Sequence, residues 1–482
     1  MSHLEGESRD QGSLLPAVLD DYVAAEHPVR VIDAFVESLD LGALGFSRVV
    51  AAATGRPGYA PGSLLKVYVY GYLNQVRSSR RLARECERNV EVMWLLRRLT
   101  PRFKTIADFR RDHPQAIVAV CRAFTRFCRE LGLFSAQLVA VDGTKVGAVA
   151  SRKRVMTPKR VEQEQTRVEA RIAAYLQAMD EADEEEAEPS AAPQDVRAAL
   201  EALKSRRSEL QALASQMADE GLGQVVEGEP DAKLMRGAHG HLTGYNAQIA
   251  VDEKHHLIAA SEVTNECNDH RQLLPMGEAA KASLGVERLE VVADTGYANG
   301  EQGRACAERG ITACVPRPTV VNPRGDYFTR ERFSYDAESD SYRCPAGETL
   351  PRWRTSRTQQ QYQYWSKACG ECALKGQCTD RKQRVIVRSF FEPDVEAMNE
   401  RAKSDPKRMC LRHSLAEHPI GTMKWLMGVP RFLVRGLGKV RGEFGLVVLG
   451  YNLKRVIAVL GVRTVLQRLA DWRAGALNPA PA

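Results

Sequence analysis

Two short apolar runs, far apart in the chain, each end in an aspartate with a glycine close behind it. Residues 137–145 contain four apolar residues and then Asp142-Gly143, and residues 289–297 repeat the pattern up to Asp294 and Gly296. Such runs, bounded by Asp and Gly, are typical of buried strands, so each pattern predicts a strand that carries one carboxylate to its end. The alternative interpretation is that each aspartate only caps a turn.

The segments between and after these runs predict a mixed sheet. Residues 244–252 and 257–263 are rich in β-formers and are separated by a short charged turn, which indicates a hairpin. A helix is expected near residues 273–283, and a fifth strand at 311–316. The fold class is therefore α/β, and the order of strand, hairpin, helix, strand, helix and strand is that of a ribonuclease H-like five-stranded sheet.

In such a sheet Asp142 and Asp294 could converge at one edge, where carboxylate oxygens suit hard divalent cations. Asp269, in the segment after the expected hairpin, is an additional acid near this edge. The alternative role for Asp269 is a loop cap.

Upstream of this α/β segment the chain has helical periodicity. From residue 14 to 133, apolar residues recur at spacings of three and four, with a break rich in Gly and Pro at 55–62, so an all-helical N-terminal domain is expected. Cations are concentrated between residues 77 and 111 and include Arg80, Arg81 and Arg84. Helices with arginines on one face suit binding to a phosphate backbone, in a helix-turn-helix-like arrangement. The alternative is the solvated surface of a helical bundle.

Two insertions interrupt the α/β domain, which is expected to span residues 134–465. Residues 155–225 carry two apolar stripes of helical spacing around an acidic turn at 180–193, which predicts a helical hairpin without assigned chemistry. Residues 317–391 form a Cys-rich insertion, expected to resemble a zinc ribbon. Four thiolates in one segment could bind Zn²⁺ and stabilise a region with little apolar material, although the spacing is irregular and a small core containing thiols is the alternative. The candidate ligands are Cys344, Cys369, Cys372 and Cys378.

Near the C-terminal end, Glu417 and Lys424 are seven residues apart, which places them on one face of a continuous helix. Pro419 suggests that Glu417 lies in the first turn of that helix. An acid and a lysine on one face could supply a metal ligand and a phosphate contact, or could be a surface pair without function.

Composition narrows the classes of protein. The chain has 482 residues, of which 44% are hydrophobic and 27% charged, and its net charge is +7, as expected for a globular protein of two to four domains. No run of eighteen apolar residues and no secretory leader is present, which favours a cytoplasmic protein. Eleven cysteines in such a chain are expected to be reduced thiols rather than a disulfide framework.

The chain resembles bacterial insertion-sequence transposases of the DDE superfamily, which combine an all-helical N-terminal domain with a ribonuclease H-like catalytic domain. The resemblance extends from about residue 14 to 465. It rests on the Cys-rich insertion and on Val141-Asp142-Gly143-Thr144-Lys145, Gly244-Tyr245-Asn246-Ala247-Gln248, Ala293-Asp294-Thr295-Gly296-Tyr297, the segment from Arg412 through Glu417 to Lys424, and Tyr451-Asn452-Leu453-Lys454-Arg455.

The resemblance implies specific roles. Asp142, Asp294 and Glu417 match the acidic triad that binds two Mg²⁺ or Mn²⁺ ions, and Arg412 and Lys424 match the basic positions around the glutamate. Lys145, beside Asp142, is a further candidate DNA contact. One departure from the family pattern is Met409, which stands where a tyrosine usually opens the C-terminal signature.

The expected activity is phosphoryl transfer on DNA. Water would first release a 3′-hydroxyl at the end of the element, and this hydroxyl would then attack target DNA in line, with two metal ions assisting both steps. The expected partners are element ends with inverted repeats, target DNA and at least one further copy of the chain, and the expected location is the bacterial nucleoid. The alternatives are a transposase-derived DNA-binding protein without catalysis and a plain metal-dependent nuclease.

Overall fold

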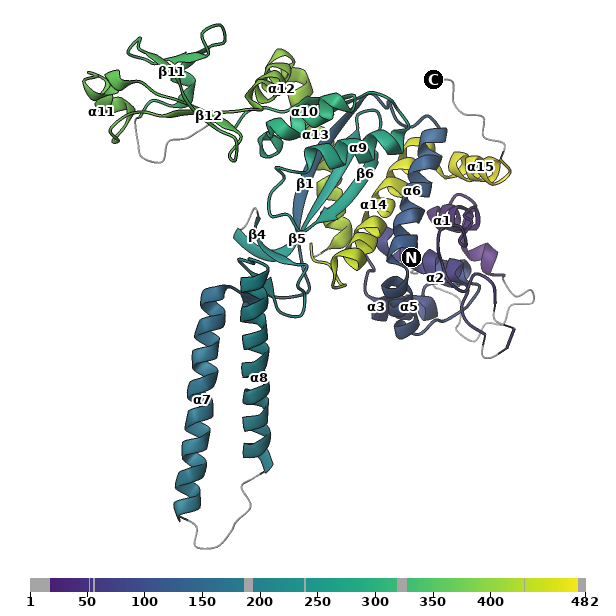
Figure 1. Ribbon diagram of the computed structural model, residues 1–482. Helices are drawn as coiled ribbons and strands as arrows, with labels where there is room; N and C mark the ends of the chain where they lie inside the picture. Colours follow the sequence, from purple (N-terminus) through teal and green to yellow (C-terminus); the bar gives the residue numbers. More distant parts are fainter. Residues whose placement is uncertain are drawn as a thin grey trace, which may run out of the picture.

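The computed structural model describes residues 18–51, 53–54, 57–185, 194–237, 240–318, 327–428 and 430–475 (Figure 1). Residues 14–17, at the expected start of the helical domain, lie outside these ranges, as do residues 55–56 of the Gly and Pro break and 186–193 of the acidic turn. The first part of the described chain is helical, with a short 3-10 helix and six α-helices. These are η1 (Leu19–Tyr22), α1 (Pro28–Glu37), α2 (Pro61–Leu73), α3 (Ser79–Arg88), α4 (Val90–Leu96), α5 (Phe103–Asp112) and α6 (Pro114–Glu130).

Local sequence explains where several of these helices begin. Proline occupies the first turn of α1, α2 and α6, where its missing N–H costs nothing and its fixed φ favours the helix. At the start of α1, His27 accepts a hydrogen bond from Val29 N through Nδ1 at 3.2 Å. The buried faces of α1, α2 and α6 meet in one apolar core, in which Phe35 and Phe124 pack edge to face.

The central sheet has six strands, and their bounds are β1 (Leu138–Gly147), β4 (Lys233–Gly237), β5 (Gly240–Asp252), β6 (Ile258–Thr264), β7 (Leu289–Val292) and β8 (Ile311–Cys314). The antiparallel neighbours of β5 are β1, β4 and β6, whereas β1, β7 and β8 run parallel. The prediction of an α/β fold with a mixed sheet is confirmed. The expected strand number of five is too low by one, because β4 pairs with residues 240–244 of β5, upstream of the segment expected as a strand.

The first strand is also longer than its sequence suggested. We expected β1 to stop at Asp142-Gly143, but it continues for five residues beyond Asp142. The physical reason is the partner strand: β5 is 13 residues long and pairs with β1 as far as Gly147↔Gly244, so the backbone of β1 keeps hydrogen-bond partners past the glycine.

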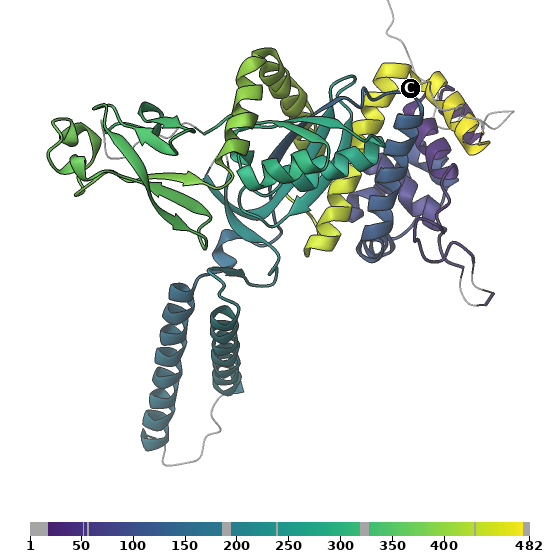
Figure 2. The same cartoon turned by 45° about the horizontal axis from the view of Figure 1, so that its top comes forward.

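Helices cover the sheet and join it to the N-terminal helices (Figures 1 and 2). Among them, α9 packs against β5 and β6, α13 against β1 and β5, and α14 against β6 and also against α2 and α6. Their bounds, with those of the remaining helices of this part, are α9 (Leu273–Leu284), η3 (Thr295–Tyr297), α10 (Gly300–Glu308), α12 (Glu392–Ser404), α13 (Pro406–Met427), α14 (Leu437–Leu460) and α15 (Val462–Arg473).

Helix α14 fastens the turn between β5 and β6 through polar side chains. Asn452 is almost fully buried, and its side-chain amide donates to Ile258 O and accepts from Ile258 N, both at 2.9 Å. Tyr451 Oη donates to His256 O and Arg455 Nε to His255 O, each at 2.7 Å. Three residues of the Tyr451–Arg455 motif therefore satisfy backbone groups at this turn.

A helical hairpin projects from the body (Figure 1). It consists of α7 (Pro158–Glu185) and α8 (Gln194–Asp219), and at its base lie η2 (Arg152–Arg154) and a small sheet of β2 (Val155–Met156) and β3 (Val225–Val226). The two helices pack through a separate apolar core that contains the stripes seen in the sequence, among them Val161, Ile172, Leu200, Leu210 and Met217.

The described residues 327–391, which we call the Cys-rich lobe, contain a five-stranded antiparallel sheet in the order β13-β12-β11-β10-β9. A small core that includes Phe333, Tyr342 and Tyr364 holds the lobe together. At the junction with α12, the buried Glu392 carboxylate pairs with Arg317 and Arg330, and Arg388 forms two hydrogen bonds with Glu396. Its elements are η4 (Arg330–Arg332), β9 (Ser334–Asp336), β10 (Ser341–Arg343), β11 (Thr349–Ser356), β12 (Gln361–Tyr364), η5 (Lys367–Gly370), α11 (Lys375–Cys378) and β13 (Ile386–Ser389).

Within the described ranges, no single helix has the length and apolar composition needed to cross a membrane. Helices α14 and α15 meet that test only as a pair, and the chain bends by 110° between them.

Candidate active site

The strand register places Asp142 and Asp294 beside each other. Parallel pairing of β1 with β7 runs from Leu138↔Glu290 to Ala140↔Val292, and the two aspartates follow two residues later on their respective strands. Carboxyl ends of neighbouring parallel strands form one edge of a sheet, so both carboxylates emerge there. The electrostatic influence of Asp294 on Asp142 agrees with this proximity.

Backbone amides hold both side chains. Asp142 Oδ1 accepts a hydrogen bond from Gly143 N at 2.7 Å. Asp294 is the N-cap of η3, and its Oδ1 accepts from Gly296 N at 2.8 Å. The sequence thus encodes the local orientation of each carboxylate through the glycine that follows it.

A third carboxylate, Asp269, reaches the same edge from the segment between β6 and α9. A Cβ atom on Gly296 would lie 3.0 Å from Asp294 Oδ1 and 3.9 Å from Asp269 Oδ2, so the two carboxylates approach one point. A Cβ on Gly143 would lie 2.9 Å from Asp269 Oδ1 and 2.2 Å from Gln248 Nε2, a distance no real Cβ adopts. Glycine at 143 is therefore required for close approach rather than for ending the strand.

Three donors fix the position of Asp269. Lys145 Nζ lies 3.0 Å from Asp269 Oδ1, and the side-chain amides of Asn246 and Gln248 each donate to the same oxygen at 2.7 Å. Gln248 also accepts a hydrogen bond from the hydroxyl of the buried Tyr297. Lys145, Asn246 and Gln248 thus face the site from the adjacent strands β1 and β5.

The pKa of Asp142 is raised to about 6, chiefly because the carboxyl is buried. The hydrogen bond from Gly143 N opposes this rise, whereas the nearby charges of Asp294 and Asp269 add to it. Arg412 lowers the pKa, and its Nη1 lies 3.6 Å from Asp142 Oδ2. Burial, followed by these three aspartates, also raises the pKa of Tyr297 well above its usual value. The site gathers three carboxylates, and the two cations beside them are Arg412 at Asp142 and Lys145 at Asp269.

This donor set fits a hard divalent cation, because carboxylate oxygens are the ligands that Mg²⁺ and Mn²⁺ prefer and a cation would relieve the repulsion. Across the described residues, no group of three or more His, Cys, Asp and Glu side chains is arranged so as to enclose an ion already. The arrangement brings the acids together, and binding of an ion would complete their convergence.

Comparison with protein families places this site in context. Residues 17–112 match the family described as Transposase domain (DUF772), and residues 343–457 match the Transposase DDE domain. The two matched segments support a DNA transposase, an enzyme that cleaves and transfers DNA, and DDE domains generally use divalent metal ions. The two matches leave residues 113–342, which contain Asp142, Asp269 and Asp294, outside the aligned ranges.

No curated protein matches the transposase over its sequence. Among solved structures, a cryo-EM structure of the piggyBac transposase synaptic complex with hairpin DNA is similar at 8% identity and a TM-score of 0.34, covering 94% of this chain and 80% of that chain. A likeness this distant assigns no residue of the transposase a role.

The structure does not bring Glu417 to the aspartates. Helix α13 begins at Pro406 and continues through Pro419, so Glu417 lies inside the helix and not in its first turn as we expected. Its side chain is 67% exposed, and Oε1 lies 2.9 Å from His413 Nδ1. Arg412, which faces Asp142, is five residues away, or about 140° around the helix. Lys424 shares the exposed face with Glu417, as the spacing predicted, but this face is turned to solvent.

The three candidate DNA-binding arginines of α3 lie on its exposed face. In α3, Leu82 and Cys86 are buried, whereas Arg80, Arg81 and Arg84 are exposed. The Arg80 guanidinium lies 5.5 Å from the ring centre of Phe103, which is itself 49% exposed on the neighbouring α5.

The four cysteines of the lobe are half-buried free thiols, with Cys344 after β10 and Cys378 at the end of α11. Burial raises the pKa of Cys378, and Cys369, Cys344 and Cys372 are close enough to raise it further. The thiols are therefore neighbours, although they are not among any described set of residues arranged to enclose an ion.

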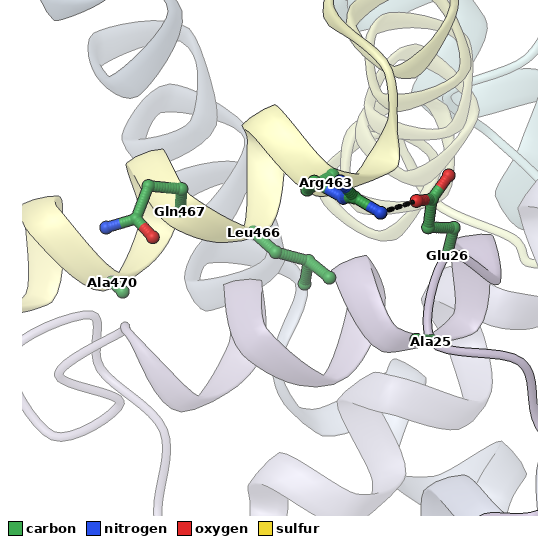
Figure 3. A pocket seen from close by; sticks show the side chains of 6 residues that line it. All are labelled: Ala25, Glu26, Arg463, Leu466, Gln467 and Ala470. Carbon is green, nitrogen blue, oxygen red and sulfur yellow. Dashed lines mark hydrogen bonds and ion pairs between the residues drawn. The ribbon is translucent and has the colours of Figure 1, made fainter.

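A shallow pocket elsewhere on the transposase has no part in this chemistry. Figure 3 shows it between the residues before α1 and helix α15, where Arg463 pairs with Glu26 at 2.6 Å. Its other lining residues are Ala25, Leu466, Gln467 and Ala470, and none of the site residues lines it.

The polar network around Asp269 has a signal in the sequence of β5. Asn246 and Gln248 alternate with apolar residues in β5, and both are fully buried. Buried amides need partners, so two of them on one face of a strand indicate a polar site. Asp269, by contrast, lies in a loop segment with no periodic pattern.

Proposed function

We propose that this transposase cuts the ends of an insertion sequence and joins them to target DNA by phosphoryl transfer at the edge where Asp142 and Asp294 meet. The observation that carries the proposal is the register of β1 and β7, which supports a shared site for two residues 152 positions apart in a DDE transposase. We further propose that the sheet is ribonuclease H-like. The order β6-β5-β1-β7-β8, with only the last three strands parallel, supports this assignment.

The same reasoning supports a division into an N-terminal helical domain at 14–133 and a catalytic domain at 134–465, interrupted by the hairpin at 155–225 and the Cys-rich segment at 317–391. In this division, α14 belongs to the catalytic domain while packing on α2 and α6 of the helical domain. The helical domain would contact DNA through Arg80, Arg81 and Arg84.

Asp142 and Asp294 are the proposed ligands of Mg²⁺ or Mn²⁺, and a pair of such ions stabilises the attacking and leaving oxygens of an in-line displacement. Arg412 lies against Asp142. Its guanidinium could donate two parallel hydrogen bonds to a phosphate bound at this edge. Lys145, held by Asp269, places an ammonium beside the same edge. These cations would bind and orient the scissile phosphate.

Two carboxylates, those of Glu417 and Asp269, are candidates for the third metal ligand. Glu417 matches the family motif, but α13 would have to turn about its axis for Glu417 to reach Asp142, and that turn would move Arg412 away from Asp142. Asp269 already lies among the aspartates, and its carboxylate is satisfied by Lys145, Asn246 and Gln248. We propose Glu417 as the third metal ligand and Asp269 as the positioning residue for Lys145.

The experiment that tests the function is incubation of the purified full chain with Mg²⁺ or Mn²⁺ and linear DNA carrying the inverted repeats that flank its gene, followed by assays for nicking and joining. We expect Glu417→Gln to lower the cleavage rate by about a thousandfold, which corresponds to the several kcal/mol that a metal site contributes. We expect Asp269→Asn to raise KM more than it lowers kcat, because it releases Lys145 from its position.

A near-complete loss of kcat in Asp269→Asn, together with full activity of Glu417→Gln, would reverse these two assignments. Cutting without joining by the parent would identify a plain nuclease. Binding without cutting in either metal would identify a DNA-binding protein derived from a transposase. Pairing of two element ends requires at least a dimer, so sedimentation of the protein on end DNA is expected to show two or more copies. We propose that the enzyme acts at the nucleoid of a bacterial cell, because its proposed substrate is DNA.

We also propose that Cys344, Cys369, Cys372 and Cys378 bind one Zn²⁺ in the Cys-rich lobe. Their proximity, their reduced state and the small core of the lobe support this assignment. We expect about one zinc per chain in protein purified without chelator, and loss of that zinc in Cys372→Ser, measured by elemental analysis. As a control, Cys410→Ser, an exposed thiol on α13, should retain the metal. Equal zinc content in the two variants would disprove the site.

A further inference from the structure

We propose that the exposed sheet face of the Cys-rich lobe, around Trp353 and Arg354 of β11, binds the DNA next to the cut site. This inference deepens the proposed function and rests on it for the identity of the ligand. It adds a DNA contact outside the N-terminal helices and outside the carboxylate site.

The lobe carries most of the excess positive charge of the protein. Residues 327–391 contain twelve Lys and Arg and seven Asp and Glu, a net charge of +5 in a chain whose total is +7. This concentration of positive charge in 65 residues favours a polyanion as the partner over a protein surface of mixed charge.

The middle of β11 is exposed to solvent, although the strand has a neighbouring strand on each side. Residues 351–355 are all exposed, although β11 pairs with β10 and β12. Trp353 is 56% exposed, and its ring packs edge to face on Trp365 at a centroid distance of 5.8 Å. A large aromatic ring held in this way on a sheet surface forms a rigid apolar platform, which costs little further ordering when a ligand covers it.

Strand register continues this surface across the sheet. Arg354 lies opposite Gln363 of β12, and Gln363 lies opposite Val387 of β13. Cross-strand partners share one face of a sheet, so a cation, an amide and an apolar side chain follow each other in a row. Val387 is 39% exposed, so this face is not covered by the rest of the chain.

The cations of this surface are available to a ligand. Among the described residues, Arg354 and Arg357 form no ion pair with an acidic side chain. Arg352 is not part of this surface, because it lies opposite Tyr364 on the other face of the sheet, where it pairs with Asp340 at 2.9 Å and lies over the ring of Tyr362. Arginines contact phosphates, and an aromatic ring between them contacts sugars or a base freed at a cut end.

The position of the lobe suits a DNA that crosses the active site. Figures 1 and 2 show the lobe at one end of the molecule and the N-terminal helices at the other, with the central sheet between them. A duplex held by the arginines of α3 at one end would pass the carboxylate edge and meet the lobe at the other.

The test measures binding separately from cleavage. Full-length protein carrying Asp142→Ala is titrated with a duplex that contains one inverted repeat, and the dissociation constant is measured over a range of salt concentrations. Adding Trp353→Ala should weaken binding about tenfold, which is within the range for loss of one aromatic contact. Adding Arg354→Ala should weaken binding and reduce the slope of log K against log salt by about one, whereas Arg354→Lys should restore the slope.

The matched control is Arg167→Ala on α7, another exposed arginine, which should leave both the dissociation constant and the slope unchanged. Because Trp353 and Arg354 are exposed, their replacement should also leave the melting temperature and zinc content unchanged. Binding by both lobe variants within twofold of the parent would overturn this inference while leaving the transposase activity standing. Weakened binding by the lobe variants, together with no cutting of end DNA by the parent protein that retains Asp142, would support the lobe and overturn the proposed function.

Discussion

Asp142→Asn and Asp294→Asn are expected to abolish strand cleavage while DNA binding persists. Each change replaces a carboxylate by an amide of nearly the same shape, so it removes the charge that a divalent ion needs without opening a cavity. The loss should be about a thousandfold or more in the cleavage rate, because a metal site contributes several kcal/mol to the transition state. Quenched-flow or gel assays on end DNA, with a parallel binding titration, measure both quantities.

These two changes should not lower the stability of the folded state. Asp142 lies close to Asp294 and Asp269, and this repulsion contributes to the raised pKa of its carboxyl. A neutral side chain relieves that repulsion, so the melting temperature of Asp142→Asn is expected to stay the same or rise. Asp219→Asn, at the exposed end of α8, is the matched control and should cut DNA as the parent does. Cleavage at the parental rate by either active-site variant would refute the assigned role of that aspartate.

Glu443→Ala should lower the free energy of unfolding by about 3–5 kcal/mol, the usual cost of removing one partner from a buried ion pair. Glu443 lies on α14 and is fully buried. Its carboxylate lies 3.4 Å from Arg77 Nη1 and 3.9 Å from Arg110 Nη1. It also accepts hydrogen bonds from Leu433 N and Val434 N, at 2.8 and 3.2 Å.

The alanine variant would leave buried guanidinium charge uncompensated and two backbone amides without their acceptor. These groups join α14 to the N-terminal helices, so the effect should appear in the unfolding transition that both parts share, followed by circular dichroism in urea. Glu400→Ala, an exposed glutamate on α12, provides the control and should change stability by less than about 0.5 kcal/mol. A similarly small change for Glu443→Ala would show that the network contributes nothing net.

The β-strands that carry Asp142 and Asp294, the two proposed catalytic aspartates, were predictable because their signal is local. Short apolar runs before Asp142 and Asp294 are buried on both faces of the sheet, and such runs have few other stable solutions. The helical stripes of the projecting hairpin were predictable for the same reason, since periodic apolar spacing is a property of neighbouring residues.

Periodicity also placed Glu417 and Lys424 on one helical face, which the structure bears out. It could not decide which face of α13 meets the sheet. That orientation depends on Leu415, Ala416 and Met423, which pack inward, and on Arg412, which reaches Asp142. Because α13 has apolar and polar residues on several sides, the face that packs on the sheet is set by contacts with neighbouring segments.

The sequence by itself determined five of the six strands of the central sheet, their order along the chain and the glycine that follows each aspartate closely and donates its amide to the carboxylate. Only the tertiary structure decided that β1 and β7 pair in parallel with Ala140 opposite Val292, that Asp269 enters between Lys145, Asn246 and Gln248, and that Glu417 faces solvent. The physical reason is the distance along the chain over which each kind of interaction acts. Hydrogen-bonding periodicity and turn chemistry act over a few residues, whereas register, side-chain convergence and helix rotation depend on contacts between segments more than a hundred residues apart.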